Sequence, residues 1–150
     1  MSRKVLILNG PNLNMLGTRE VEIYGRETLA DIETKCATHA KKSGLEVDFR
    51  QTNGEAEMVD WIQGAQGTVA GLIINAGAYT HTSIAILDAL KMIDVPVIEV
   101  HLSNIFQRES FRAESYVSQA AKGIIAGFGA HSYLLALDAI SQLIGAGKDT

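Results

Sequence analysis

The sequence predicts an α/β fold of the flavodoxin-like kind: a five-stranded parallel sheet, order 2-1-3-4-5, with helices on both faces. Two observations predict it. Short β-branched apolar runs alternate with helical stretches along the chain. The runs are apolar at nearly every position, which is typical of strands buried on both faces. Right-handed crossovers between successive strands then favour this strand order.

The elements follow one another without a linker or a repeat. Residues 4–9 form a predicted strand, residues 28–43 an amphipathic helix closed by Gly44, and residues 45–52 a second strand with in/out alternation. The same alternation of elements continues to the end of the chain: helix 55–65, strand 69–75, helix 83–93, strand 95–102, strand 123–128 and helix 131–144.

Composition narrows the class of protein. The chain has 150 residues, of which 47% are hydrophobic and 20% charged, so we expect one domain over residues 1–150 with a proper core. A net charge of −4 argues against nucleic acid or an anionic membrane as partner. The lone cysteine, Cys36, falls on an apolar helix stripe and is expected to be a buried thiol. With no membrane-length apolar stretch or signal peptide, we expect a cytoplasmic protein.

Polar residues collect where strands one, three and four end. In open sheets of this kind, ligands bind beyond the carboxyl ends of the strands, beside the point where strand order reverses. Asn12 follows the first strand, Asn75 and His81 follow the third, and Glu99 and His101 lie at the end of the fourth. Any one of them is readily explained as a turn or surface residue. Their coincidence at one edge predicts a binding site.

Glu99 and His101 are two positions apart on a predicted strand, so their side chains point to the same face. An anionic carboxylate beside an imidazole stabilises its protonated form, which suits a general acid. The alternative is that both side chains lie beyond the sheet edge in water.

Tyr24 lies between two arginines, Arg19 and Arg26, a few residues after the first strand. Nearby guanidinium groups favour a phenolate, which could remove a proton. Three glutamates in the same segment leave open a simpler interpretation, a solvated loop.

The helix predicted over residues 83–93 is apolar nearly all round, and the last helix is similarly apolar. A helix without a polar face is usually buried on both sides, which in a chain this small suggests a subunit interface. Asp88 would lie at or near that interface, or on a thin solvent-facing stripe.

Several motifs together carry a family resemblance. They are Asn9-Gly-Pro-Asn-Leu-Asn-Met-Leu-Gly-Thr-Arg-Glu, Ile23-Tyr-Gly, Ile74-Asn-Ala-Gly-Ala-Tyr-Thr-His-Thr-Ser, Glu99-Val-His-Leu-Ser-Asn and Phe111-Arg112. In order and spacing they resemble the type II 3-dehydroquinate dehydratases of the shikimate pathway, over essentially the whole chain.

The resemblance implies anti elimination of water from 3-dehydroquinate, through an enolate, to give 3-dehydroshikimate. It implies no cofactor, no metal and no Schiff base. Tyr24 matches the family's base and Arg19 the lid arginine that tunes it. Asn12 matches the residue that helps hold a water against the enolate oxygen. His101 matches the acid that protonates the leaving hydroxyl, with Glu99 as its orienting partner.

The resemblance also implies the binding groups. Asn75 and the backbone amides of Leu102 and Ser103 match the carboxylate site, while His81 and Arg112 match groups that hold ring hydroxyls.

The family further assembles as dodecamers of four trimers, in which the residue matching Asp88 reaches a neighbouring subunit's site. One departure is Ala113-Glu114, where many relatives carry histidine, so that an added acid follows Arg112.

Two other classes remain as alternatives. A metal-dependent hydrolase would use His81, His101 and His131, although no pair has a recognised ligand spacing. A flavin- or nucleotide-binding module is compatible with the fold, although the loop after the first strand lacks G-x-G-x-x-G and a P-loop lysine. A receiver domain is disfavoured, because asparagines stand where acidic metal ligands would be needed.

Overall fold

A parallel sheet forms the centre of the protein. The computed structural model describes residues 3–18, 22 and 25–148. Its strands are β1 (Lys4–Asn9), β2 (Glu46–Gln51), β3 (Gly71–Asn75), β4 (Val97–His101) and β5 (Gly123–Ala126). They pair in parallel in the order β2-β1-β3-β4-β5. The predicted fold class and strand order are therefore confirmed.

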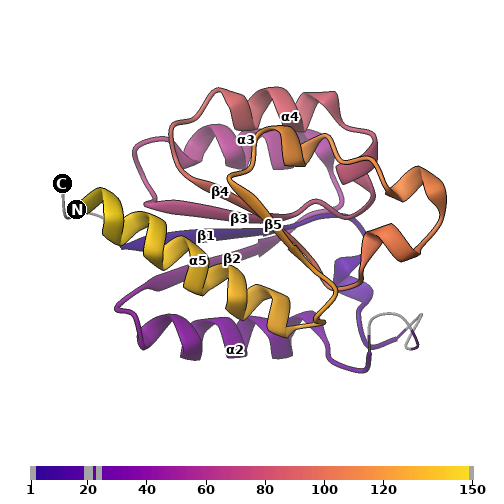
Figure 1. Ribbon diagram of the computed structural model, residues 1–150, viewed down its shortest axis with the longest axis horizontal. Helices are drawn as coiled ribbons and strands as arrows, with labels where there is room; N and C mark the ends of the chain where they lie inside the picture. The colour runs from indigo at the N-terminus through magenta and orange to yellow at the C-terminus, as the bar shows by residue number, and fades with distance from the viewer. Residues whose placement is uncertain (1–2, 19–21, 23–24, 149–150) are drawn as a thin grey trace.

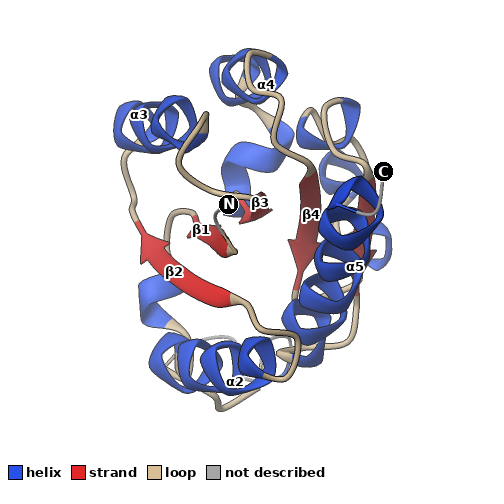
Figure 2. Ribbon diagram, turned by 90° about the vertical axis from the view of Figure 1, so that its left-hand side faces the viewer, coloured by secondary structure: helices blue, strands red, loops and turns tan. Residues whose placement is uncertain are grey.

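Helices cover both faces of this sheet (Figure 1). On one face lie α2 (Leu29–Lys41) and α5 (His131–Lys148), and on the other α3 (Glu55–Ala65) and α4 (Ile84–Lys91). Figure 2, turned by 90°, shows the same two helical layers with the sheet between them. Short 3₁₀ helices lie in the connections: η1 (Leu13–Met15), η2 (Gly77–His81), η3 (Ile105–Gln107), η4 (Ser110–Arg112) and η5 (Val117–Gln119). None of the helices in the described ranges combines the length and hydropathy that a membrane span requires.

The central strands are apolar because both of their faces are covered. Along β1, Val5 and Ile7 point into the cluster beneath α2 and α5, whereas Leu6 and Leu8 point into the cluster beneath α3 and α4. All four side chains are buried. Alternation along this strand therefore divides side chains between two cores rather than between core and water.

Local sequence explains where α2 begins and ends. The Thr28 hydroxyl accepts a hydrogen bond from the Asp31 backbone N–H at 3.2 Å, and the Asp31 carboxylate accepts one from the Thr28 N–H at 3.0 Å. This capping box satisfies two N–H groups that the first turn would leave unpaired. Gly44, with φ of 70°, takes the left-handed conformation just beyond the helix, as predicted.

The in/out alternation predicted for β2 is wrong in its burial. Val47 and Phe49 pack on the core beneath α2 and α5, but Asp48 and Arg50 are half-buried too. The Arg50 guanidinium donates two hydrogen bonds to the Asp48 carboxylate, at 3.1 and 2.8 Å, and lies 5.4 Å from the Trp61 ring centre. Polarity alternates along this edge strand, but α3 covers its polar face as well.

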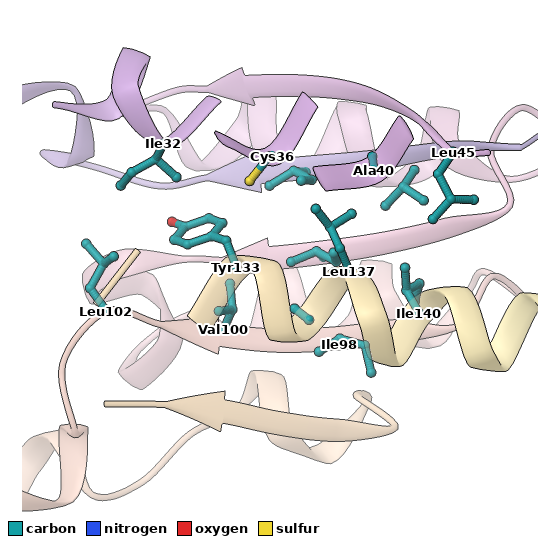
Figure 3. Close-up of a cluster of buried hydrophobic side chains, with 14 of the residues drawn as sticks. Ile32, Cys36, Ala40, Leu45, Ile98, Val100, Leu102, Tyr133, Leu137 and Ile140 are labelled. Atoms are coloured by element: carbon teal, nitrogen blue, oxygen red, sulfur yellow. The ribbon is translucent and has the colours of Figure 1, made fainter. Parts of the chain in front are cut away.

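Much of the apolar surface of the last helix is buried in the core of the chain. Tyr133, Leu137 and Ile140 of α5 are fully buried between the sheet and α2, facing Ile32 and Cys36 (Figure 3). Burial raises the pKa of the Cys36 thiol to about 12, with the charge of Glu33 adding to the effect. The prediction of a buried thiol is therefore confirmed, and the apolar character of α5 is mostly explained by the core.

Candidate active site

A pocket of about 120 Å³ opens at the carboxyl ends of β1, β3 and β4. This is the edge predicted from the strand-end polar residues. The strand order reverses here, because β1 is followed in sequence by β2 on one side and pairs with β3 on the other. The pocket is lined by residues that follow each of these three strands and by two arginines from later turns, Arg108 and Arg112.

Two glycines allow the loops after β1 and β3 to touch. A Cβ on Gly10 would collide with the backbone carbonyl of Ala76, and one on Gly77 would lie 3.1 Å from the Pro11 carbonyl oxygen. Gly77 also has φ of 60°, in the left-handed region that favours glycine. The Gly10 N–H donates to the Asn75 carbonyl at 2.8 Å and so joins the two loops. The close approach of these two loops, which forms the floor of the pocket, therefore requires glycine at positions 10 and 77.

Asn12 reaches the pocket from a backbone conformation that few residues adopt. Its φ is 70°, and asparagine is one of the few side chains that tolerate this region. The Asn12 N–H donates to the Asn53 side-chain oxygen at 3.0 Å, which also accepts from the Gln51 amide at 3.0 Å. Gln51 donates in addition to the Gly10 carbonyl at 3.1 Å. The end of β2 thus holds the loop that carries Asn12.

Glu99 and His101 form a buried pair on β4. Their side chains lie on one face of the strand, with the His101 Nε2 atom 2.5 Å from the Glu99 Oε2 atom. Glu99 is fully buried and His101 is 5% exposed. The alternative, that both side chains lie in water beyond the sheet edge, is therefore wrong. Because His101 also lines the pocket, the pair connects the core to the site.

Two serines complete the surroundings of the Glu99 carboxylate. The Ser115 hydroxyl donates to it at 2.8 Å, and the Ser118 hydroxyl donates to its other oxygen. Burial alone would raise the pKa of the Glu99 carboxyl, but the hydrogen bond and charge of His101 and the two serine hydroxyls lower that pKa below its ordinary value. Glu99 is therefore an anion at neutral pH. It accepts from Nε2, which leaves Nδ1 as the His101 nitrogen able to transfer a proton.

His81 lies beside His101, with ring centres 6.4 Å apart and the planes nearly parallel. Its Nδ1 atom is 2.7 Å from the Glu114 carbonyl oxygen. Burial lowers the pKa of His81, and the positive charges of His101 and Arg112 lower it further against the opposing effect of the carbonyl. A carbonyl can only accept, so Nδ1 carries the proton and the neutral ring presents Nε2 as an acceptor.

Positive charge faces the pocket from the later turns. Arg108 and Arg112 both line it, and the Arg112 Nε atom donates to the exposed Glu109 carboxylate at 3.0 Å. Of the pocket-lining residues that the structure describes, none is Asp or Glu. Such a site favours an anionic ligand of small size. Glu114, the added acid that follows Arg112 in the sequence, contacts His81 through its backbone carbonyl and not through its carboxylate.

Most of the predicted site residues come together here. Seven of them line the pocket: Asn12, Asn75, His81, His101, Leu102, Ser103 and Arg112. Glu99 lies behind His101 and reaches the pocket through it. Asp88 does not line the pocket; it is exposed on α4. Arg19 and Tyr24 lie outside the described residues.

Sequence reasoning missed the residues that hold the site in place. Asn53, which carries the Asn12 loop, and the two serines that bind Glu99 were not singled out. A buried glutamate needs partners for both of its oxygens, and Ser115 and Ser118 follow it on a polar turn. That requirement was a signal for hydroxyl groups in general, although it could not say which of the nearby serines would serve.

The three histidines considered as metal ligands do not form one cluster. His81 and His101 are neighbours, whereas His131 is exposed at the start of α5. Within the described ranges, no group of three or more His, Cys, Asp or Glu side chains is placed to share a metal ion.

Comparison with known proteins identifies close relatives. Residues 3–141 match the family described as dehydroquinase class II. The chain is 56% identical over 142 residues to 3-dehydroquinate dehydratase 2 of Pseudomonas aeruginosa, covering 95% of this chain and 96% of that one. It is 56% identical over 145 residues to the 3-dehydroquinate dehydratase of Streptomyces coelicolor, covering 96% and 92%. The crystal structure of a type II dehydroquinase from Propionibacterium acnes superimposes with a TM-score of 0.90 at 44% identity, covering 95% and 98%.

Proposed function

The chain belongs to the class II dehydroquinase family, and we infer that it is a 3-dehydroquinate dehydratase, a hydro-lyase of the shikimate pathway. We propose that it removes water from 3-dehydroquinate by anti elimination through an enolate, giving 3-dehydroshikimate. The observation that carries the mechanism is the buried Glu99–His101 pair, with His101 facing a pocket rich in cationic and neutral donors.

In the second half of the reaction, His101 acts as the general acid. The enolate electrons form the new carbon–carbon double bond and break the carbon–oxygen bond to the departing hydroxyl. A proton from Nδ1 of His101 goes to that oxygen, and water leaves. The Glu99 carboxylate, 2.5 Å from Nε2, stabilises the imidazolium that precedes this transfer and fixes the ring orientation.

In the first half, Tyr24 acts as the base that removes the proton next to the ketone. Support for this role comes from the family resemblance alone, because Tyr24 and Arg19, the residue that tunes it, lie outside the described residues. Asn12 helps to hold a water against the developing enolate oxygen. Its fixed left-handed backbone and its place in the pocket suit such a role, because a preorganised group needs no rearrangement as charge develops.

The substrate carboxylate is bound by Asn75 and by the backbone amides of Leu102 and Ser103, all of them pocket residues. His81 and Arg112 hold ring hydroxyls. The neutral His81 accepts through Nε2 while the Arg112 guanidinium donates, so the two groups suit opposite sides of a hydroxyl. The positive charge of Arg108 and Arg112 adds long-range attraction for the anionic substrate.

The assembly is a dodecamer of four trimers in the cytoplasm. Asp88 reaches the site of a neighbouring subunit from α4, where it is exposed together with the apolar side chains of Ile84, at the start of the helix, and Met92, just beyond its end. An exposed acid flanked by large apolar groups suits a protein interface better than a solvent-facing helix surface.

The test is the ultraviolet appearance of the conjugated enone product from 3-dehydroquinate, repeated with a chelator and after borohydride treatment in the presence of substrate. The proposal expects full activity after both treatments. Tyr24→Phe and His101→Ala should each abolish most turnover while the assembly stays intact. Normal turnover in either variant contradicts the assigned role, and loss of activity with the chelator alone would revive a histidine metal site.

A further inference from the structure

A chain of three buried polar side chains runs behind the pocket. It joins Asn9, at the end of β1, to Tyr133 on α5 and to Asn75, at the end of β3. The Tyr133 hydroxyl donates to the Asn9 side-chain oxygen at 2.6 Å and accepts from the Asn75 side-chain nitrogen at 2.9 Å. All three residues are buried, and Figure 3 shows the phenol among Ile32, Cys36 and other apolar side chains.

Backbone groups fix the direction of this chain at both ends. The Asn9 side-chain N–H donates to the Arg50 carbonyl at 3.0 Å, and a carbonyl can only accept. At the other end, the Asn75 side-chain oxygen accepts from the Gly77 N–H at 3.2 Å, and an N–H can only donate. Asn9 must therefore turn its oxygen toward Tyr133, and Asn75 must turn its nitrogen toward the same hydroxyl. The phenol hydroxyl donates to Asn9 and accepts from Asn75, so a single hydroxyl orientation satisfies both asparagines.

The direction matters because Asn75 also lines the pocket. Its nitrogen carries two N–H groups, one of which is used by Tyr133. The second remains for a ligand. If the amide were reversed, its oxygen would replace that donor and would repel an anion.

We propose that Tyr133 is a positioning residue that holds the Asn75 amide with its N–H available to the substrate carboxylate. The inference rests on the proposed binding role of Asn75. It assigns a function to a helix residue that does not itself line the pocket, acting on the site through a single hydroxyl.

The surroundings of Tyr133 suit this task. Burial raises the pKa of the phenol far above its ordinary value, so the hydroxyl keeps the proton that it donates to Asn9. The ring packs against Phe49, with ring centres 6.3 Å apart, and cannot swing out to find water. Removing the hydroxyl would leave a donor on Asn75 and an acceptor on Asn9 without partners in an apolar region.

Steady-state kinetics of Tyr133→Phe would test the proposal. The change removes one oxygen and leaves the ring. We expect KM for 3-dehydroquinate to rise about tenfold while kcat stays within about threefold of wild type, since the amide keeps its bond from the Gly77 N–H but loses the second hydrogen bond that holds its orientation, and the Glu99–His101 pair is untouched. Asn9→Ala gives an independent route, because it frees the phenol proton to turn toward Asn75 and should raise KM similarly.

Ile140→Val is the matched structural control. Ile140 is buried in the same apolar cluster on the same helix, so its truncation should lower thermal stability without changing KM. Asn75→Ala distinguishes the binding role of Asn75 from the positioning role of Tyr133. If Asn75→Ala leaves KM unchanged, the binding role of Asn75 is wrong and the positioning role falls with it. If Asn75→Ala raises KM but folded Tyr133→Phe and Asn9→Ala do not, the positioning role alone is overturned.

Discussion

Replacing the Glu99 carboxylate by its neutral amide, in Glu99→Gln, is the sharpest probe of the proposed acid. The two side chains have the same shape, but glutamine has only one acceptor oxygen and carries N–H groups that donate. In the protein, Glu99 accepts from His101 and from the hydroxyls of Ser115 and Ser118. His101 and Ser115 share one carboxylate oxygen, and Ser118 can rotate to accept from an amide at the other, so a glutamine oxygen can still accept from the Nε2–H of a protonated His101. The substitution therefore removes the negative charge that supports the imidazolium and leaves a neutral acceptor in its place.

The size of the effect follows from the charge that this hydrogen bond loses. A hydrogen bond involving a charged group contributes about 1.5–3 kcal/mol, which corresponds to about 10- to 150-fold in rate. The 2.5 Å contact between Glu99 and His101 is short and buried, so we expect the loss in kcat to lie toward the upper part of this range. His101→Ala, which removes the acid itself, should cost about 100- to 10,000-fold. KM should change little in Glu99→Gln, because Glu99 does not line the pocket.

The assay is initial-rate formation of the enone product, with thermal unfolding measured alongside to show that each variant is folded. Glu57→Gln is the control: it neutralises a carboxylate that accepts a hydroxyl hydrogen bond from Thr52 at 2.5 Å, on α3 rather than on β4. Glutamine keeps an acceptor oxygen there, so kcat should stay close to that of wild type. A folded Glu99→Gln with undiminished kcat would refute the reasoning that the anion supports proton donation by His101.

Three further predictions concern other parts of the molecule. The lowered pKa of Glu99 means that its ionised form stabilises the fold above the ordinary pKa of 4.5, and that this stability is lost as pH falls through the lowered native pKa. The Tm difference between wild type and Glu99→Gln should therefore be full at neutral pH and shrink as pH falls below 4.5. Asn53→Ala removes the acceptor for the Asn12 N–H, so kcat should fall about tenfold with about 1 kcal/mol of stability lost, whereas Asn53→Asp keeps an acceptor oxygen and should retain most activity in the same assay. Cys36 is buried with a pKa raised to about 12, so a disulfide reagent should leave the native protein unmodified at mildly alkaline pH and label it fully in denaturant; prompt labelling without denaturant would contradict the burial.

Much of the fold was predictable because local and long-range signals agree. The apolar runs of β1, β3 and β4 identify buried strands, and the capping residues Thr28 and Gly44 mark the ends of α2. The burial of β2 was mispredicted for a tertiary reason. Its polar residues Asp48 and Arg50 satisfy each other and lie against α3, so they are half-buried although the sequence alternates.

The position of the site could be predicted from the sequence, but the residues that hold its polar side chains in place could not. Strand-end polar residues are visible in the sequence because they interrupt apolar runs. Their partners come from segments far along the chain: Tyr133 is separated by 58 residues from Asn75 and by 124 from Asn9. The last helix is apolar nearly all round, so the hydroxyl of Tyr133 does not stand out in the sequence. A buried tyrosine usually finds a hydrogen-bond partner, which was the available signal.

The strand ends themselves explain why this edge of the sheet became the site. Asn9, Asn75 and His101 are the last residues of β1, β3 and β4, and each is buried. Burying a polar group costs free energy unless it is hydrogen-bonded, so leucine, isoleucine and valine fill most of the interior of β1 and β3. At this edge the cost is met by partners from α5 for the two asparagines, and by Glu99 for the histidine. Because those partners orient the polar groups as well as satisfying them, the same hydrogen bonds that permit burial also prepare the site for a ligand.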